Sequence, residues 1–162
     1  MTKQRTKAPV HAALARAHAL QAAGDEGRAL EVLVELVRSA PADAAARSAL
    51  ADFLALQGRP AEAIESYEKS LALEPDAPAV LMSLARLYLR HAEPEKAEVS
   101  LRRAVARKAG PEASLLLGEL LKDKGDSAAA APHLRRAAAG KTGSGDAHAA
   151  MAYAGVGDRA AL

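Results

Sequence analysis

The sequence predicts an all-α fold, an α-solenoid of about four helix-turn-helix repeats followed by a C-terminal helix. One observation is a set of marks that recurs along the chain, with Gly58 matched by Gly24, Ala92, Gly125 and Gly157 at steps of 34, 34, 33 and 32 residues. Self-similarity at this period is typical of stacked helical hairpins. The other is composition: Ala and further strong helix formers dominate, β-branched residues are few, and aromatic residues make up 2% of the chain.

The first repeat is predicted over about residues 10–43. Residues 1–8 are polar and basic, so we expect a flexible N-terminus. A helix should run from Pro9 to Ala23 and end at Gly24, which adopts left-handed conformations easily. Asp25 is placed to cap the next helix, whose apolar face is spaced three and four residues apart. That face consists of Leu30, Leu33, Val34 and Val37, and Pro41 closes the repeat.

The second and third repeats, about 44–77 and 78–110, show the same pattern. In each, a Leu-Ala pair marks the first helix, and a proline stands where the second helix should begin. The second helix then carries Ala, a larger residue and Leu or Val at helical spacing. These positions are Leu50, Ala51, Leu54, Gly58, Pro60, Ala63, Ile64, Tyr67, Ser70, Leu71 and Pro75 in the second repeat, and Leu81, Leu84, Ala85, Tyr88, Pro94, Ala97, Leu101, Ala104 and Val105 in the third.

The fourth repeat, about 111–142, places Leu117, Gly118 and Leu121 where the second repeat has Leu50, Ala51 and Leu54. Gly125 and Asp126 are predicted to end one helix and cap the next, which continues with Ala130, Leu134 and Ala137. The segment 140–145, GKTGSG, is predicted to be a flexible linker before a terminal helix at 145–156. The whole repeat domain is therefore expected to span 9–158.

These marks resemble the tetratricopeptide repeat (TPR) family, whose pattern is a large residue, Leu-Gly/Ala, Tyr or Leu, Gly, Ala, an aromatic or Leu, Ala and Pro. The match covers roughly residues 10–157 and is best in the second repeat. The large first residue is replaced in most repeats, which predicts a lighter core than the family's average; the residues there are Ala13, Arg47, Leu81, Ser114 and Asp146. The resemblance implies a right-handed solenoid that acts as a non-enzymatic protein-interaction module.

The resemblance also implies a concave groove lined by the first helix of each repeat. The register then gives the partner-binding candidates, which are His18, Gln21, Ser48, Asp52, Met82, Arg86, Leu89, Arg90, Leu115, Glu119 and Lys122. Leu56 and, on the terminal helix, His148 and Met151 face the same way. Arg86 and Arg90, one helical turn apart, form a pair of cations that could hold a carboxylate. An acidic partner segment is therefore expected. The alternative is that these arginines pair with Glu119 or Asp52 or simply face water.

Composition limits the classes of partner. The net charge of +2 does not indicate nucleic acid, and the chain has no Asn, which family members that clamp a peptide's terminal carboxylate usually use. Residues 1–77 carry nine Lys or Arg and eleven Asp or Glu, whereas residues 78–162 carry thirteen and nine. Acidic partners are therefore expected at the C-terminal half. A basic cluster on second helices, Arg102, Arg103, Arg107, Lys108, Arg135 and Arg136, is expected to face water or a secondary acidic partner.

No pattern in the sequence indicates catalysis or a cofactor. Cys is absent, which excludes thiolate chemistry and disulfides. Gly140-Lys141-Thr142 ends like a phosphate-binding loop, but Arg135 replaces the earlier Gly and a helix precedes it. The five histidines are dispersed, and His11 and His18 are about 10 Å apart along one helix, too far to share an ion. We expect a non-enzyme that binds no metal.

The chain shows no signal peptide and no apolar run of membrane-spanning length, so a cytoplasmic protein without membrane insertion is expected. The composition, rich in Ala and Arg, resembles coding from a GC-rich bacterium. Two alternatives to an adaptor stay open. One is a chaperone for a secreted or assembled subunit. The other is a self-associating scaffold, a homodimer through the apolar side of the C-terminal helix.

Overall fold

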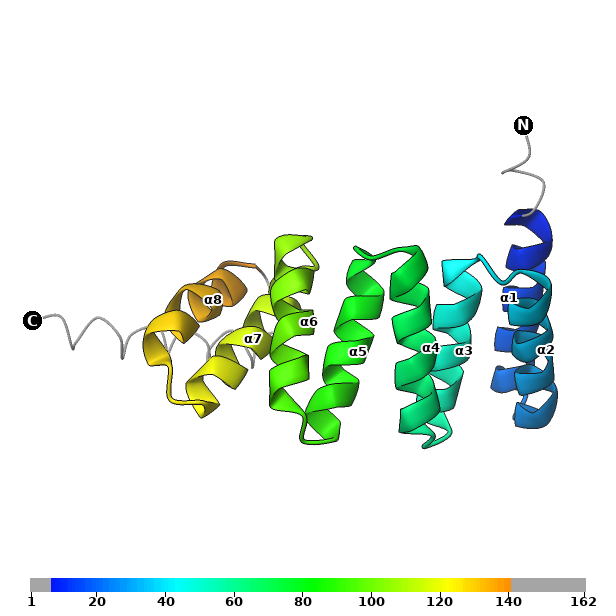
Figure 1. Ribbon diagram of the computed structural model, residues 1–162, viewed down its shortest axis with the longest axis horizontal. Coiled ribbons are helices and arrows are strands. Elements are labelled where there is room, and N and C mark those ends of the chain that lie inside the picture. Colours follow the sequence, from blue (N-terminus) through cyan, green and yellow to red (C-terminus); the bar gives the residue numbers. More distant parts are fainter. Residues whose placement is uncertain (1–6, 141–162) are drawn as a thin grey trace, which may run out of the picture. The chain divides into compact units, whose positions relative to one another are not determined.

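The structure is a computed structural model that describes residues 7–140, with side chains described from Pro9 onwards. These residues form eight α-helices and no strand, which confirms the predicted all-α class for this part of the chain (Figure 1). The helices are α1 (Lys7–Ala22), α2 (Glu26–Ser39), α3 (Ala44–Leu56), α4 (Pro60–Leu73), α5 (Pro78–Arg90), α6 (Pro94–Ala106), α7 (Pro111–Asp123) and α8 (Ser127–Ala139). The predicted linker after Gly140 and the terminal helix at 145–156 lie outside the described residues.

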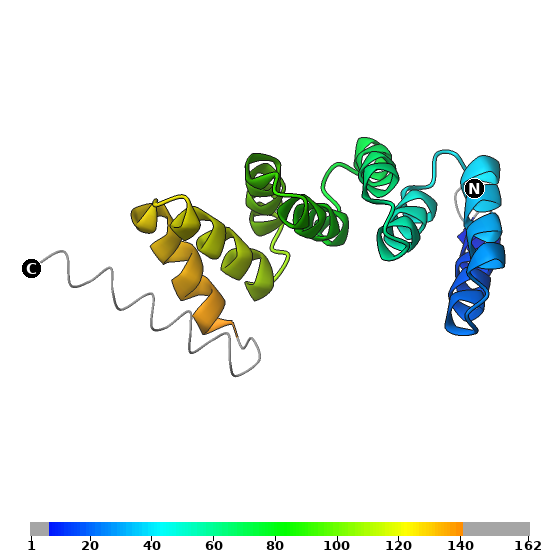
Figure 2. The same cartoon turned by 90° about the horizontal axis from the view of Figure 1, so that it is seen from below.

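The helices divide between two compact units, Met1–Pro75 and Asp76–Leu162. In the first unit, α1 packs against α2 and α3 against α4, while α2 and α1 also contact α3. In the second, α5 packs against α6 and α7 against α8, and α6 joins the two hairpins by packing against α7 (Figure 2). Each unit is thus a pair of helical hairpins stacked on each other, the arrangement that a repeat of this period predicts.

Local capping fixes where several helices begin. The Asp25 carboxylate accepts a hydrogen bond from the backbone N–H of Arg28, and Asp126 does the same for Ala129, which confirms both predicted caps. Asp43 caps α3 in the same way through the N–H of Ala46. α4, α5, α6 and α7 lack a side-chain cap but carry proline in the first turn, where its missing N–H leaves no helical bond unmade.

The turn between α5 and α6 stores backbone strain. Ala92 has a φ of 54°, whereas Gly58, at the equivalent place between α3 and α4, has 69°. Left-handed backbone costs an L-residue roughly 1–2 kcal/mol but costs glycine almost nothing. Alanine at this position therefore keeps the turn geometry of the repeat at the expense of stability.

We expect Ala92→Gly to raise the free energy of unfolding by about 1 kcal/mol, the relieved strain being partly offset by greater freedom of the unfolded chain. Gly58→Ala is the matched reverse change and should lower it by about as much. Urea unfolding of both variants measures this. A loss of stability in Ala92→Gly would show that the turn is not strained.

The core follows the predicted helical stripes closely. Within the second unit, the stripe residues predicted from the third and fourth repeats are buried, among them Leu81, Leu101, Leu117 and Leu134, except for Val105, which is half-buried. In the first unit, one buried cluster joins Ala17, Ala29, Leu33 and Phe53, and another joins Val10, Leu36 and Ala46.

Val34 was wrongly assigned to the apolar face of α2. It is 50% exposed, because the buried stripe of α2 passes through Ala29, Leu33 and Leu36. Adjacent residues of a helix are rotated by about 100° from one another, so the residue after Leu33 points away from the stripe.

Candidate functional site

The predicted partner-binding residues of the first unit lie on α1 and α3. His18 and Gln21 are three residues apart on α1; Ser48, Asp52 and Leu56 follow one another at four-residue spacing on α3. Residues at these spacings share a helix face. His18 interacts electrostatically with Asp52, so the two helices bring their polar residues together. We call this surface, His18, Gln21, Ser48, Asp52 and Leu56, the α1–α3 face.

Asp52 is the most constrained group of the α1–α3 face. The hydroxyl of Tyr67, a buried residue of α4, donates a hydrogen bond to Asp52 Oδ1 at 2.5 Å. Although Asp52 keeps exposed surface, partial withdrawal of its carboxylate from water raises its pKa above the usual 3.8; the Tyr67 hydrogen bond and the charge of His18 act in the opposite direction. Within the described residues, no Lys, Arg or His forms an ion pair with this carboxylate.

The neighbours of Asp52 on α3 differ in character. The Ser48 hydroxyl turns back and donates to the carbonyl oxygen of Ala45 at 3.1 Å, so its hydrogen bond is used within the helix. Leu56 is 73% exposed, an unusual position for a large apolar side chain. The α1–α3 face therefore offers a carboxylate and, one helical turn further, an apolar contact.

In the second unit, the predicted residues fall into two groups. Arg86, Arg90 and Glu119 are exposed, and Leu89 and Lys122 are half-buried, so all five present surface. Met82 and Leu115 are buried instead, which leaves them little area for a partner to contact. Arg86 forms an ion pair with Glu112 of α7, and not with Glu119 or Asp52, the internal partners considered as the alternative. Arg90 makes no ion pair within the described part of the chain, and is the arginine of the pair left to meet a partner's carboxylate.

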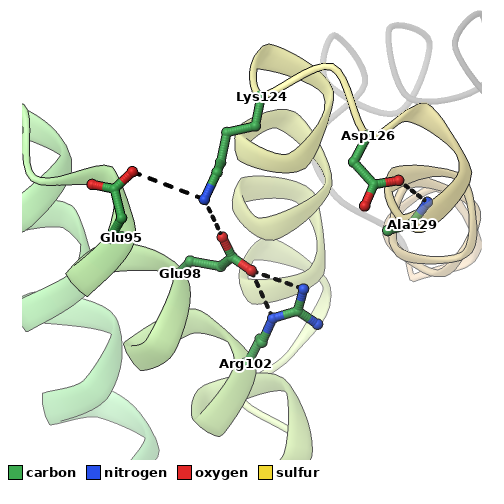
Figure 3. Close-up of polar contacts among 6 residues, drawn as sticks. All are labelled: Glu95, Glu98, Arg102, Lys124, Asp126 and Ala129. Atoms are coloured by element: carbon green, nitrogen blue, oxygen red, sulfur yellow. Dashed lines mark hydrogen bonds and ion pairs between the residues drawn. The ribbon is translucent and has the colours of Figure 1, made fainter.

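A charge network joins the second helix α6 to the C-terminal end of the first helix α7. Glu98 of α6 accepts hydrogen bonds from Arg102 Nε at 2.9 Å and from Lys124 Nζ at 2.7 Å, and Lys124 also lies 4.0 Å from Glu95 (Figure 3). Glu98 is the least exposed of these four side chains, and its two cations lower its pKa below the usual 4.5. Because Lys124 follows α7, the network ties α6 to the end of that helix.

This network predicts a pH-dependent contribution to stability. Because the folded pKa of Glu98 is lowered, its contribution is fully present above pH 4.5 and is lost as the pH falls through the folded pKa. Wild type should therefore melt at a higher temperature than Glu98→Gln at pH 7, and the difference should shrink below pH 4.5. Glu95→Gln, whose carboxylate is far more exposed, is the control and should change little at either pH. A constant difference across this range would contradict the assignment.

Other kinds of site find little support within residues 7–140. No group of three or more His, Asp or Glu side chains there is arranged to hold a metal ion. His133 has its pKa lowered by burial and by the neighbouring charges of Arg102 and Arg136, which favour its neutral form. None of the described helices combines the length and apolarity that crossing a membrane requires.

Two contacts of the site were not predicted from the sequence. Tyr67 was assigned to the core without a role for its hydroxyl, and Glu112 was not considered as the partner of Arg86. Each contact joins residues on different helices, 15 and 26 positions apart. Only the packing of the hairpins brings them together, so no short-range pattern indicates them.

The chain repeats an antiparallel helical hairpin and carries charged residues on the first helix of each hairpin. This arrangement defines the class of helical-repeat interaction proteins. Family models described as tetratricopeptide repeat match residues 14–78, 54–120 and 111–136, which together cover most of the chain. The protein belongs to the tetratricopeptide repeat family.

Solved structures show the same fold at low sequence identity. The MamA protein superposes with a TM-score of 0.75 at 20% identity, covering 94% of this chain and 86% of that one. A tetratricopeptide repeat protein from Parabacteroides merdae gives 0.79 at 22% identity over 90% of this chain and 58% of its own. YrrB, described as a TPR protein with an unusual peptide-binding site, gives 0.74 at 21% identity over 89% and 73%.

A curated relative matches only in part. Cellulose synthase operon protein C of Pseudomonas fluorescens is 38% identical over 95 residues, which is 58% of this chain but 7% of that protein. The chain thus spans a small fraction of the length of this relative.

Proposed function

We propose that the protein is a non-enzymatic interaction module, an adaptor that binds a segment of a partner protein on the faces of its first helices. The proposal rests on two charged side chains that form no ion pair within the described part of the chain. Asp52 in the first unit and Arg90 in the second both lie on first helices and lack an ion-pair partner among the described residues. A charged group that forms no internal ion pair can pair with a partner's charge without breaking a salt bridge of the fold.

The surface chemistry favours an adaptor over a chaperone of hydrophobic clients. Among the described residues, the exposed large apolar side chains are Val34, Leu56, Leu73 and Val99, and of these only Leu56 belongs to a first helix. A chaperone that covers apolar subunits needs a broader hydrophobic surface. Self-association through 145–156 concerns residues outside those described and remains a prediction, as does a groove continuous across all four repeats.

Affinity capture with charge-reversed variants tests the proposal. Proteins bound by the wild type should be lost with Arg90→Glu, which reverses a free cation on a first helix. They should be retained with Arg135→Glu, which changes another exposed cation, on the second helix α8. Recovery that depends on Arg135 and not on Arg90 would place the binding surface on the second helices and overturn the proposal.

A further inference from the structure

The α1–α3 face holds a carboxylate in a fixed orientation. Tyr67 is buried in α4, and its hydroxyl reaches Asp52 Oδ1 at 2.5 Å, so the tyrosine ring determines where the carboxylate points. An ionised carboxylate accepts several hydrogen bonds, and the tyrosine engages only one of them. A preorganised acceptor loses less conformational freedom on binding than a free side chain does.

The carboxylate also lacks a Lys or Arg partner. Among residues 9–140, no Lys or Arg forms an ion pair with Asp52, and the charged neighbour that acts on it is His18 of α1. Exposed carboxylates elsewhere in the chain, such as Glu62 and Glu65, do form ion pairs. Partial withdrawal from water, which raises the pKa of Asp52, means that part of its hydration has already been lost. A cation brought by a partner therefore gains the attraction while displacing less water.

An apolar contact accompanies the carboxylate at a defined separation. Leu56 lies four residues after Asp52 on α3 and is 73% exposed. Four residues rise about 6 Å along a helix. Two residues of an extended chain advance about 6.6 Å and point their side chains to the same side. An extended segment with a basic and an apolar residue two positions apart matches this spacing.

We propose that the α1–α3 face recognises a basic side chain of the partner segment through Asp52, and an apolar side chain two residues away through Leu56. This inference rests on the proposed function and adds the chemistry of the guest. It assigns Tyr67 as a positioning residue that orients Asp52. It also predicts that the first unit selects the opposite charge to the one Arg90 selects in the second.

Selection of random twelve-residue peptides displayed on phage tests the inference on the full chain. Peptides enriched by the wild type should carry Lys or Arg with an apolar residue two positions away. Selection on Asp52→Asn, which keeps the side-chain shape and an acceptor for Tyr67, should lose the basic preference. Selection on Leu56→Ser should lose the apolar one. Glu35→Gln, at an exposed carboxylate of α2 outside the α1–α3 face, is the control and should enrich the wild-type pattern.

Binding of one enriched peptide, measured by fluorescence anisotropy, gives the size of the effect. Asp52→Asn should weaken binding about tenfold or more, and so should replacing the peptide's lysine by norleucine. Combining both changes should weaken it no further than either alone, since they remove the same contact. Tyr67→Phe should weaken binding less, because the carboxylate remains but is no longer oriented.

The outcomes separate the inference from the proposed function. If no peptide is enriched over the bare support, the proposed function fails, and the inference fails with it. If peptides are enriched but show no basic preference, or keep it on Asp52→Asn, the inference alone is overturned. Circular dichroism of each variant confirms that its helices are retained.

Discussion

Leu101→Ala should lower the free energy of unfolding by about 2–5 kcal/mol, the largest effect we expect from a single substitution in the described residues. Leu101 lies in α6 with no exposed surface, at the position where the repeat places its large second-helix residue. Truncation removes buried methyl groups and leaves a cavity that a packed helical hairpin can fill only in part.

Val99→Ala is the matched control for this prediction. Val99 lies on the same helix but is 59% exposed, so its truncation removes little buried area and should change stability by less than about 0.5 kcal/mol. Urea unfolding followed by circular dichroism measures both variants. Equal effects of the two substitutions would mean that α6 does not bury the face assigned to it.

Gly118→Ala should destabilise the protein by about 1–2 kcal/mol, even though alanine is the better helix former. A Cβ atom added at Gly118 would lie 2.7 Å from Cγ and Cδ2 of the buried Leu134 and 3.2 Å from its backbone nitrogen. The side chain of Leu134 would have to leave its place in the core, and α8 would have to move away from α7. The close approach of these helices is thus possible only with glycine.

Gly27→Ala tests the same substitution without the contact. Gly27 lies in the first turn of α2, and an added Cβ there would meet no atom within 4 Å. The change should therefore stabilise the protein by up to about 1 kcal/mol through helix propensity. Thermal unfolding of both variants should show shifts of opposite sign, and a stabilised Gly118→Ala would show that α7 and α8 lie further apart than described.

Helix positions and their ends could be predicted from the sequence because local chemistry determines them. Asp25 and Asp126 each precede a helical run and cap it, and Pro60 and Pro94 stand in a first turn, where the missing N–H of proline leaves no helical bond unmade. The period of the marks then gives the hairpin arrangement. The turn between the two helices of a hairpin keeps its left-handed backbone even where glycine is absent, since Ala92 adopts the conformation that glycine has in the other hairpins.

The candidate site was predicted less completely, and Met82 and Leu115 show why. The register argument assumes that a helix has one buried face and one free face. α5 and α7 each bury seven of thirteen residues, which extend around most of the helix circumference. A residue placed opposite the main stripe can therefore still be covered. The contact of Asp52 with Tyr67 depends on the packing of α3 on α4, which residue spacing does not reveal.

The central claim is that partners bind to the first helices. Mapping of backbone amide shifts by NMR, on titration with a peptide enriched in the phage selection, tests it most directly. We predict the largest shifts at the α1–α3 face, around His18, Asp52 and Leu56, with α2 and α4 little changed. Shifts concentrated on α2 and α4, with the α1–α3 face unperturbed, would contradict the account.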